Sequence, residues 1–361
     1  MFCKFFAENA QYLFRAWVDY KFKRRLGLSL ISSGGLIILA LLAGWALEFS
    51  IPTTNGPVSV SLSTGGTPFI ITLAALVLAV LLIGFGLWSI WQERAERDRR
   101  RAIVIEVRGL RDTSGTPLVD AVPANVIGRR IPLLINLRQG QDGAITNPGV
   151  ALRRIETLPY DIANHEGGAD RADVSFVLGG LAPVPLSFLV GVLVDDENAV
   201  MLMDWNRHQQ RWSPLDADDD GNRFTVSGLN AIPQSVDEAV MAVSVSYRAD
   251  LAGIAAKFPG LPVIELVLEA GGPDAHWSED KQAALAKQFL ETVIAIGNQG
   301  VRVIHLVLAA PNSVVFRFGR IYDKRNLPAV IAYQYERGET PPYPWGVKMP
   351  VSGAQEPELI R

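Results

Sequence analysis

Cysteine is nearly absent from this 361-residue chain, which contains only Cys3. A single cysteine excludes an internal disulfide, in agreement with a reducing compartment, and it excludes a zinc site built from thiolates. The four histidines, His165, His208, His276 and His305, lack the spacing of metal ligands. The Gly-x-Ser-x-Gly, Gly-x-x-x-x-Gly-Lys and dinucleotide-binding glycine motifs are missing as well. These absences favour a non-enzymatic protein without a metal or other cofactor.

Charge is missing from two long apolar stretches, residues 26–49 and 68–91, apart from Glu48 in the first. Because about 20 apolar residues in a helix cross a hydrocarbon core of about 30 Å, each stretch predicts a transmembrane helix. The first apolar run is too long for a signal peptide and lacks a convincing cleavage site. We therefore predict a leader over 1–25, two spans with a short external loop within 26–92, and a charged linker helix over 93–102.

The basic residues next to these spans predict how they are oriented. Lys21, Lys23, Arg24 and Arg25 precede the first span, and five arginines lie between positions 94 and 101, after the second. The loop between the spans, residues 50–67, contains no charged residue. The positive-inside rule therefore places the N-terminus and the large C-terminal domain in the cytoplasm, with the lipid bilayer as a partner.

The charge balance differs between the two parts of the chain. Residues 1–102 carry 11 basic and 6 acidic residues, whereas the remainder carries 23 basic and 31 acidic residues. An acidic domain is a poor binder of long DNA or RNA, because such binding depends on many phosphate contacts. A small anionic ligand is compatible with this charge, because a few arginines in one pocket suffice to bind it.

An alternation of strands and helices marks the C-terminal region and predicts an α/β domain with a mostly parallel sheet. Upstream, residues 103–157 are interpreted as strands and loops, and 171–178, 186–194 and 199–204 as strand-like segments. Ser278 is the predicted start of a long helix. The acidic loop 216–221 begins like a calcium-binding loop, but Ser227 stands where that motif needs a glutamate. The alternating segments are strands within 239–249, 262–272, 301–310 and 329–336 and helices within 250–258, 278–300 and 311–323.

The carboxyl ends of the predicted strands are the expected binding site, because ligands of such sheets bind there. Asn312 or Ser313 is expected to cap the helix that follows the third strand, whose N-terminus favours a phosphate. The alternative is ordinary capping, with the arginines of that helix solvated or paired with acidic residues. Trp205 and Tyr247 are candidates for base stacking or for the core, and His305 for a pocket or a core histidine. The candidate ligand-binding residues are Ser244, Ser246, Tyr247, Pro311, Asn312, Ser313, Arg317, Arg320, Trp205 and His305.

The segment VIHLVLAAPNSVVFRFGR (303–320), followed by VIAYQYE (330–336), resembles the C-terminal core of SAVED domains. The upstream segments IVIEVRGLRD, MLMDWNR and VSVSYRADL are similar to that family too, so the resemblance covers about residues 103–350, with a tail over 351–361. Two spans followed by such a domain resemble the two-transmembrane SAVED effectors of bacterial CBASS anti-phage defence. The strand–AAPNS–helix–FGR segment is the most specific part of the resemblance.

This resemblance implies a fold of two fused CARF-like Rossmann-type units with a cyclic di- or trinucleotide between them. It also implies a sensor at the bacterial inner membrane that forms a homo-oligomer on ligand binding and disrupts the membrane, which leads to abortive infection. Two alternatives remain open at this point. One is a membrane-tethered Rossmann-like enzyme, such as a ring nuclease that degrades a cyclic nucleotide, and the other is a non-enzymatic membrane scaffold.

Overall fold

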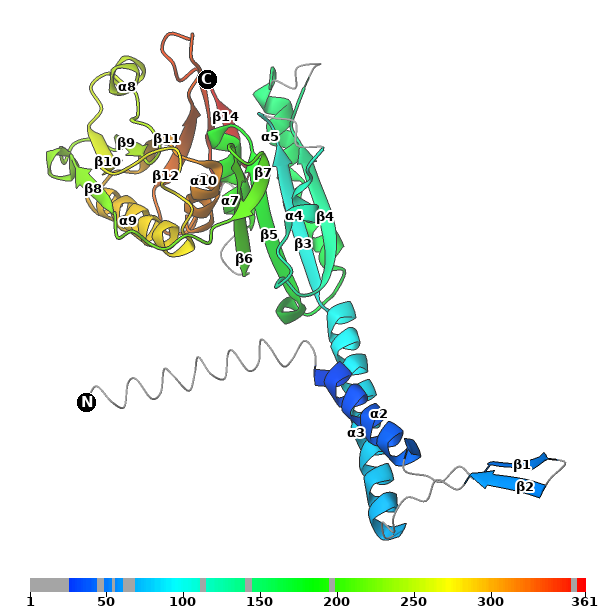
Figure 1. The fold of residues 1–361 in the computed structure, drawn as a ribbon. Coiled ribbons are helices and arrows are strands. Elements are labelled where there is room, and N and C mark those ends of the chain that lie inside the picture. Colours follow the sequence, from blue (N-terminus) through cyan, green and yellow to red (C-terminus); the bar gives the residue numbers. More distant parts are fainter. Residues whose placement is uncertain are drawn as a thin grey trace, which may run out of the picture. The chain divides into compact units, whose positions relative to one another are not determined.

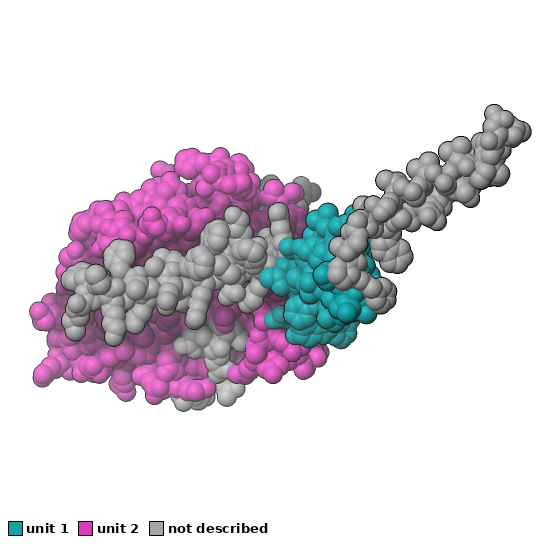
Figure 2. Space-filling view, turned by 60° about the horizontal axis from the view of Figure 1, so that its bottom comes forward, with its two compact units in different colours: residues 1–98 teal, residues 99–361 magenta. Residues whose placement is uncertain are grey.

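The computed structural model describes residues 26–43, 49–53, 56–60, 69–110, 115–139, 145–194, 199–351 and 356–361. The predicted leader over 1–25 lies outside these residues. The chain divides into two compact units, residues 1–98 and 99–361, which Figure 2 shows in different colours.

Unit 1 contains two apolar helices, α2 (Leu26–Ala43) and α3 (Phe69–Arg99). Within α3, Ile70–Glu96 is long and apolar enough to cross a membrane, with a mean hydropathy of 2.9, and Leu26–Leu41 is a shorter apolar helix. The predicted spans correspond to these helices, although residues 44–48 of the first lie outside the described residues. The predicted loop between them contains an antiparallel hairpin, β1 (Phe49–Thr53) and β2 (Gly56–Val60).

Glycines allow α2 and α3 to lie close together. A Cβ on Gly34 would lie 2.7 Å from the carbonyl oxygen of Ala79, and one on Gly86 would lie 2.7 Å from that of Gly27. Small residues of this kind are common where membrane helices pack. Gly35 and Gly84 have no such neighbour within 4 Å, so they do not take part in this contact.

Unit 2 contains two sheets, and we call the parts of the chain that form them the first half and the second half. The first half has the strand order β4-β3-β5-β6-β7, with all pairs parallel except β6 with β7. Its core strands are buried almost throughout, as expected for parallel strands covered on both faces. Its strands are β3 (Arg101–Arg108), β4 (Arg129–Asn136), β5 (Val174–Leu181), β6 (Val200–Asn206) and β7 (Arg211–Pro214).

The second half has the order β14-β13-β12-β11-β9-β10-β8, with a parallel centre of β12, β11, β9 and β10. Its strands are β8 (Phe224–Ser227), β9 (Glu238–Ser244), β10 (Val263–Leu268), β11 (Val303–Ala309), β12 (Ala329–Gln334), β13 (Trp345–Lys348) and β14 (Glu358–Ile360). The helices of unit 2 are α4 (Leu118–Ala121), α5 (Pro148–Glu156), α6 (Leu158–Glu166), α7 (Val184–Val194), α8 (Leu251–Lys257), α9 (Glu279–Asn298) and α10 (Asn312–Arg320), with short 3-10 turns at Arg171–Asp173 and Leu229–Ala231.

The two halves repeat one topology. In chain order, their four parallel strands are arranged 2-1-3-4, as β4-β3-β5-β6 in one sheet and β10-β9-β11-β12 in the other. This is a Rossmann-type strand order. The second strand lies on one side of the first and the third lies on the other, so the topological switch point is beside the first strand. The helix that follows the third strand is α7 in the first half and α10 in the second, and these two helices pack against each other between the sheets (Figure 1).

Glycines without a Cβ allow α7 and α10 to cross at close distance. A Cβ on Gly191 of α7 would overlap the carbonyl oxygen of Phe316, and one on Gly319 of α10 would overlap that of Phe188. Each helix therefore presents a glycine to the backbone of the other. The halves share one hydrophobic core, in which Phe289 stacks on Phe318 with ring centroids 4.5 Å apart.

The structure confirms the strands and helices predicted for the second half, including Ser278, whose hydroxyl accepts a hydrogen bond from the N–H of Lys281. One prediction for the first half was wrong and one was correct only in part. Residues 186–194 are part of α7 rather than a strand, because this helix is covered on nearly all sides and has no polar face that would reveal its period. The strands and loops predicted over 103–157 are confirmed at β3 and β4, but the range also includes α4 and α5, and Asn147 caps α5 ahead of Pro148.

Candidate ligand-binding pocket

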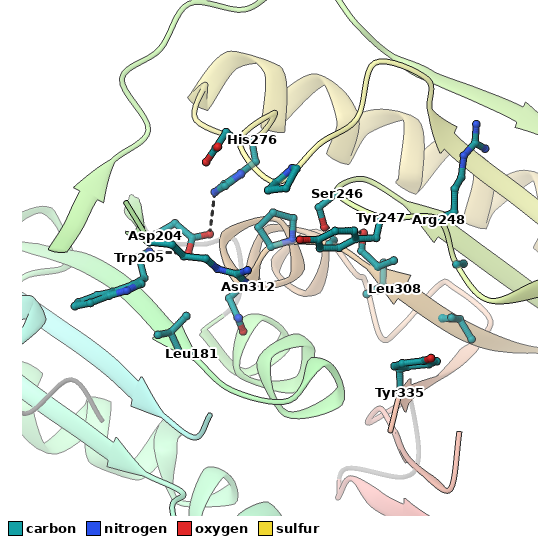
Figure 3. A pocket seen from close by; sticks show the side chains of 18 of the residues that line it. Leu181, Asp204, Trp205, Ser246, Tyr247, Arg248, His276, Leu308, Asn312 and Tyr335 are labelled. Atoms are coloured by element: carbon teal, nitrogen blue, oxygen red, sulfur yellow. Dashed lines mark hydrogen bonds and ion pairs between the residues drawn. The ribbon is translucent and has the colours of Figure 1, made fainter. Parts of the chain in front are cut away.

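A pocket of about 480 Å³ opens where the carboxyl ends of strands from both sheets of unit 2 meet (Figure 3). The first half contributes residues at the ends of β5 and β6 and the turn after β6. The second half contributes the loops after β9, β10, β11 and β12, beside the reversal of strand order between β9 and β11. The lining residues are Leu181, Asp204, Trp205, Arg207, His208, Ser246–Asp250, Pro273, Asp274, His276, Trp277, Val307–Asn312, Tyr335 and Tyr343.

The helix after β11 begins beside this pocket, but its cap differs from the predicted one. The residue before the helix is Pro311, which has no side chain able to cap it. Instead, the N–H of Ser313 donates to Oδ2 of Asp204 at 3.1 Å, so a carboxylate of the first half caps a helix of the second. The prediction that Asn312 or Ser313 caps this helix was wrong. The position expected for a phosphate holds a carboxylate of the chain itself.

Asn312 joins the two halves in the opposite direction. Its Oδ1 accepts a hydrogen bond of 2.6 Å from the hydroxyl of Ser187 in α7. Gln334, at the end of β12, accepts a hydrogen bond from the N–H of Val184 at the start of α7. Asp204 and Gln334 thus lie at or near the ends of equivalent strands, and each contacts the first turn of the helix in the other half.

His276 lies beside Asp204 in the wall of the pocket. Its Nε2 is 3.4 Å from Oδ2 of Asp204, and both side chains are about 95% buried, at 5% and 6% exposure (Figure 3). Burial is the main cause that lowers the pKa of His276, whereas the carboxylates of Asp204 and Asp274 oppose this shift. We therefore expect a neutral imidazole at pH 7 in the structure as it stands.

Five of the ten predicted residues line the pocket, namely Trp205, Ser246, Tyr247, Pro311 and Asn312. The side chain of Tyr247 is exposed, whereas Trp205 is only 6% exposed and lies edge-to-face on Trp212, with ring centroids 5.3 Å apart. Most of the Trp205 side chain is therefore part of the hydrophobic core, which was the alternative to base stacking for this residue. Whether these residues contact a ligand stays a prediction.

The other five predicted residues are not among the pocket-lining residues. Ser244 accepts a hydrogen bond from the N–H of Ala249, and the Ser313 hydroxyl accepts one from Gln282. Arg317 is 8% exposed and pairs with Glu279 at 2.5 Å, because its side chain turns toward α9.

His305 and Arg320 also lie elsewhere. His305 lies on the face of the second sheet that packs against Phe258, where its Nε2 is 2.9 Å from Glu238 and its Nδ1 is 3.1 Å from the Tyr333 hydroxyl. Arg320 is the last residue of α10, at the end of the helix away from its N-terminus at the pocket, and is half-buried. The spacing along the chain correctly predicted that Arg317 and Arg320 lie on one helix. It does not reveal which residues each side chain contacts.

The pocket has cations that the sequence analysis did not name, Arg207 and Arg248. Arg248 forms an exposed ion pair with Glu269 at 3.0 Å, and Arg207 is exposed on the turn after β6. His208 of the same turn lies 3.4 Å from Asp274, which connects the rims of the two halves. The segment MLMDWNR ends a predicted strand, so the expectation that ligands bind at strand ends also points to Asp204 and Arg207. No sequence signal places His276 here, because it lies in an irregular loop before α9.

Tyrosines supply the aromatic surface of the pocket. Tyr247 and Tyr335 are 60% and 47% exposed, so their ring faces are available for stacking. Tyr343 is buried and contacts Tyr335 edge-to-face. Burial, together with the nearby carboxylate of Asp250, raises the pKa of Tyr343 to about 12, so its hydroxyl keeps its proton at physiological pH. Among the described residues, no group of three or more histidine, cysteine or carboxylate side chains is placed to hold a metal ion.

Comparison with known families identifies both parts of the chain. The SAVED profile, described as the SMODS-associated and fused to various effectors sensor domain, matches residues 160–349, more than half of the chain. The profile of the SAVED-fused 2TM effector domain matches residues 7–152. The chain therefore belongs to the SAVED family, as a two-transmembrane SAVED effector of the CBASS type, and it is anchored in a membrane. The resemblance and the predicted fold class are confirmed.

Similar solved structures include Cap4 SAVED/CARF-domain containing receptors. The Acinetobacter baumannii receptor with the cyclic trinucleotide 2'3'3'-cAAA is 12% identical, with a TM-score of 0.48, and the match covers 78% of this chain and 58% of that one. The same receptor with 3'3'3'-cAAA is 14% identical, with a TM-score of 0.47 and coverage of 78% and 59%. The Moraxella osloensis receptor is 12% identical, with a TM-score of 0.44 and coverage of 77% and 60%. The chain thus spans less than two thirds of these receptors, and no curated protein matches it.

Proposed function

We propose that this protein is a membrane-anchored receptor that binds a cyclic oligonucleotide made during phage infection, oligomerises and disrupts the inner membrane. The observation that carries the proposal is the pocket at the strand ends of both halves in a member of the SAVED sensor family. Its volume of about 480 Å³ is in the range of small-molecule sites rather than of a groove for a nucleic-acid polymer.

The lining suits the parts of a nucleotide. Tyr247 and Tyr335 offer exposed rings on which bases stack, and Arg207 and Arg248 offer guanidinium groups to phosphates. The hydroxyl of Ser246 adds a hydrogen-bonding group after the end of β9. A ligand of two or three nucleotides would touch both halves at once, which gives it the means to stabilise one arrangement of unit 2 over another.

We test binding by calorimetry with the full chain in detergent micelles against a panel of cyclic di- and trinucleotides, with linear nucleotides as controls. One cyclic species is expected to bind more tightly than its linear counterpart. Replacing Tyr247→Ala should weaken that binding about tenfold or more, because base stacking contributes about 1–3 kcal/mol per base. The matched control is Tyr160→Ala, which removes a tyrosine that is also exposed but does not line the pocket. A panel without any binder would contradict the receptor proposal and favour the scaffold.

The output is tested with the same protein in dye-filled liposomes. We expect the cyclic species that binds to increase both the mass of the complex and the rate of dye release, and Tyr247→Ala to reduce both. Ligand-saturated protein that remains monomeric and leaves liposomes intact would contradict the effector part of the proposal while leaving ligand binding in place.

The proposal contains no catalytic step. Incubation of the ligand with the protein, followed by chromatography, is expected to return the cyclic species unchanged. Accumulation of linear product would favour the ring-nuclease alternative.

A further inference from the structure

The Asp204–His276 pair has an arrangement that the binding of bases and phosphates does not explain. Oδ1 of Asp204 accepts the N–H of Trp205 at 2.7 Å, while Oδ2 accepts the N–H of Ser313 and lies 3.4 Å from Nε2 of His276. Among the described residues, neither ring nitrogen of His276 makes a hydrogen bond of good geometry: Nε2 reaches Asp204 only at 3.4 Å, and the backbone of Pro273 is the other polar group that contacts the ring. A buried imidazole with such weak partners is uncommon in folded proteins and calls for a physical reason.

The charges around this pair oppose an anionic ligand. The described lining of the pocket holds two arginines, Arg207 and Arg248, and three aspartates, Asp204, Asp250 and Asp274. Without a proton on His276, these arginines and aspartates leave the wall negative by one charge. The charged groups near His276 are Asp204 on β6, Arg207 on the following turn and Asp274 in its own loop. A polyanion that enters such a pocket meets net repulsion, which a proton on the pair would remove.

We propose that an anionic ligand binds this pocket together with one proton, which the buried Asp204–His276 pair takes up from solvent. The inference rests on the proposed function insofar as the ligand is a cyclic oligonucleotide, which carries one negative charge per phosphate. Protonation converts a neutral imidazole beside a carboxylate into an ion pair, so the wall no longer repels a phosphate. Burial strengthens this coupling, because charges interact more strongly where water is excluded.

The second imidazole of the pocket provides a matched control. His208 also faces a carboxylate, Asp274 at 3.4 Å, but their side chains are 80% and 59% exposed. Solvent screens charges at such positions, so we expect a bound anion to act electrostatically on His208 much less than on the buried pair.

Proton uptake is measured by calorimetry on the full chain in detergent micelles, in buffers of different ionisation enthalpy at pH 7.5. The probes are inorganic pyrophosphate, which carries phosphate charge without bases, and the cyclic di- and trinucleotide panel. We expect up to one proton to be taken up per ligand. Because binding takes up a proton, affinity should rise as pH falls, by up to about tenfold per pH unit where the pair is unprotonated before binding.

Two variants assign the proton to the pair. Asp204→Asn removes the carboxylate but keeps one oxygen that accepts the N–H of Ser313, so the helix cap is retained while the hydrogen bond from the N–H of Trp205 is lost. We expect this variant to bind without proton uptake, with an affinity that no longer depends on pH between 6 and 8 and that exceeds the wild-type affinity at pH 8. His276→Gln should also abolish uptake, whereas His208→Asn should retain it.

Each outcome bears on one statement. Tight binding of a cyclic nucleotide without proton uptake, or uptake that survives Asp204→Asn or disappears in His208→Asn, overturns the proton inference and leaves the receptor proposal intact. Pyrophosphate that binds with uptake, beside a panel that does not bind, supports the inference and contradicts the receptor proposal. If no probe binds, both are overturned.

Discussion

Arg317 of the second half is buried and Arg207 of the first half is exposed, so the two arginines have different roles. Arg317 is nearly buried, and its guanidinium contacts Glu279 at 2.5 Å and Gln282 at 3.3 Å. Arg207 is exposed in the wall of the pocket. The first arrangement stabilises the packing of α10 on α9, and the second leaves a cation available to a phosphate.

We therefore expect Arg207→Gln to weaken binding of the cyclic nucleotide about tenfold or more, since a hydrogen bond to a charged group contributes about 1.5–3 kcal/mol, and to leave the melting temperature unchanged. Arg317→Gln should lower the melting temperature and leave affinity nearly unchanged. Arg302→Gln is the control, because this arginine is 79% exposed and pairs with Asp237 outside the pocket. A stronger effect of Arg317→Gln than of Arg207→Gln on affinity would contradict this assignment.

The acidic loop 216–221, which begins like a calcium-binding loop, has a structural role because it binds a buried lysine. Asp220 lies 2.8 Å from the ammonium group of Lys281, which is only 2% exposed, and the Lys281 hydrogen bond is the main cause that lowers the pKa of Asp220 to about 2. A carboxyl group whose pKa is lower in the folded than in the unfolded state stabilises the fold at pH values above its pKa in the unfolded state. That stabilisation is lost as pH falls from about 4 toward about 2.

The prediction compares Asp220→Asn with Asp218→Asn, which changes an exposed residue of the same loop. At pH 7 we expect the first variant to melt at a lower temperature than the wild type, because Lys281 loses its carboxylate partner, and the second to melt like the wild type. The difference caused by Asp220→Asn should shrink to nothing near pH 2. Thermal unfolding followed by tryptophan fluorescence measures this, and a difference that persists unchanged to pH 2 would contradict the assignment.

At the scale of elements, the crossing of α7 and α10 holds the two sheets together. Each helix places a glycine against the other helix's backbone, and each N-terminal turn contacts the opposite half through Asp204 or Gln334. The pocket lies at these helix starts, so a shift of either helix changes its shape. Tight interiors yield little to added volume, which makes this contact sensitive to a single methyl group.

Gly191→Ala or Gly319→Ala should therefore destabilise unit 2 by about 2 kcal/mol or more, because the methyl group would overlap a backbone oxygen that cannot rotate away. Gly115→Ala is the control, since a Cβ there has no neighbour within 4 Å. Urea unfolding of the detergent-solubilised protein measures the three free energies. Equal stability of Gly191→Ala and Gly115→Ala would show that the crossing adapts to the larger residue.

At the scale of the whole molecule, the chain joins a membrane anchor to a two-halved sensor. The SAVED-fused 2TM profile and the apolar helices α2 and α3 support the anchor, and the basic residues beside both spans predict a cytoplasmic sensor. Cys3 is the only cysteine, so the orientation is testable with few changes.

In spheroplasts, a membrane-impermeant maleimide should leave Cys3 unlabelled until the cells are lysed. In a Cys3→Ser background, Ser63→Cys in the segment between the spans should be labelled without lysis. The reverse pattern would contradict the cytoplasmic orientation and, with it, a receptor for a ligand made in the cytoplasm.

Patterns along the chain are enough to predict the membrane anchor, the α/β alternation of the second half, the start of α9 at Ser278 and the SAVED resemblance. These features depend on local pattern: runs of apolar residues, periodicity and capping residues are visible along the chain. The same reasoning predicted a binding site at the strand ends, and four residues of that prediction line the candidate pocket: Ser246, Tyr247, Pro311 and Asn312.

The remaining features depend on tertiary packing, which the structure shows. It showed that residues 186–194 form the helix α7, whose burial on nearly all sides removes the amphipathic pattern that distinguishes a helix from a strand. It turned Arg317 toward Glu279 and brought Asp204, Arg207 and His276 together from the two halves. Contacts between the halves join residues up to 150 positions apart, as Val184 and Gln334 are, so the packing of the two sheets is needed to reveal them.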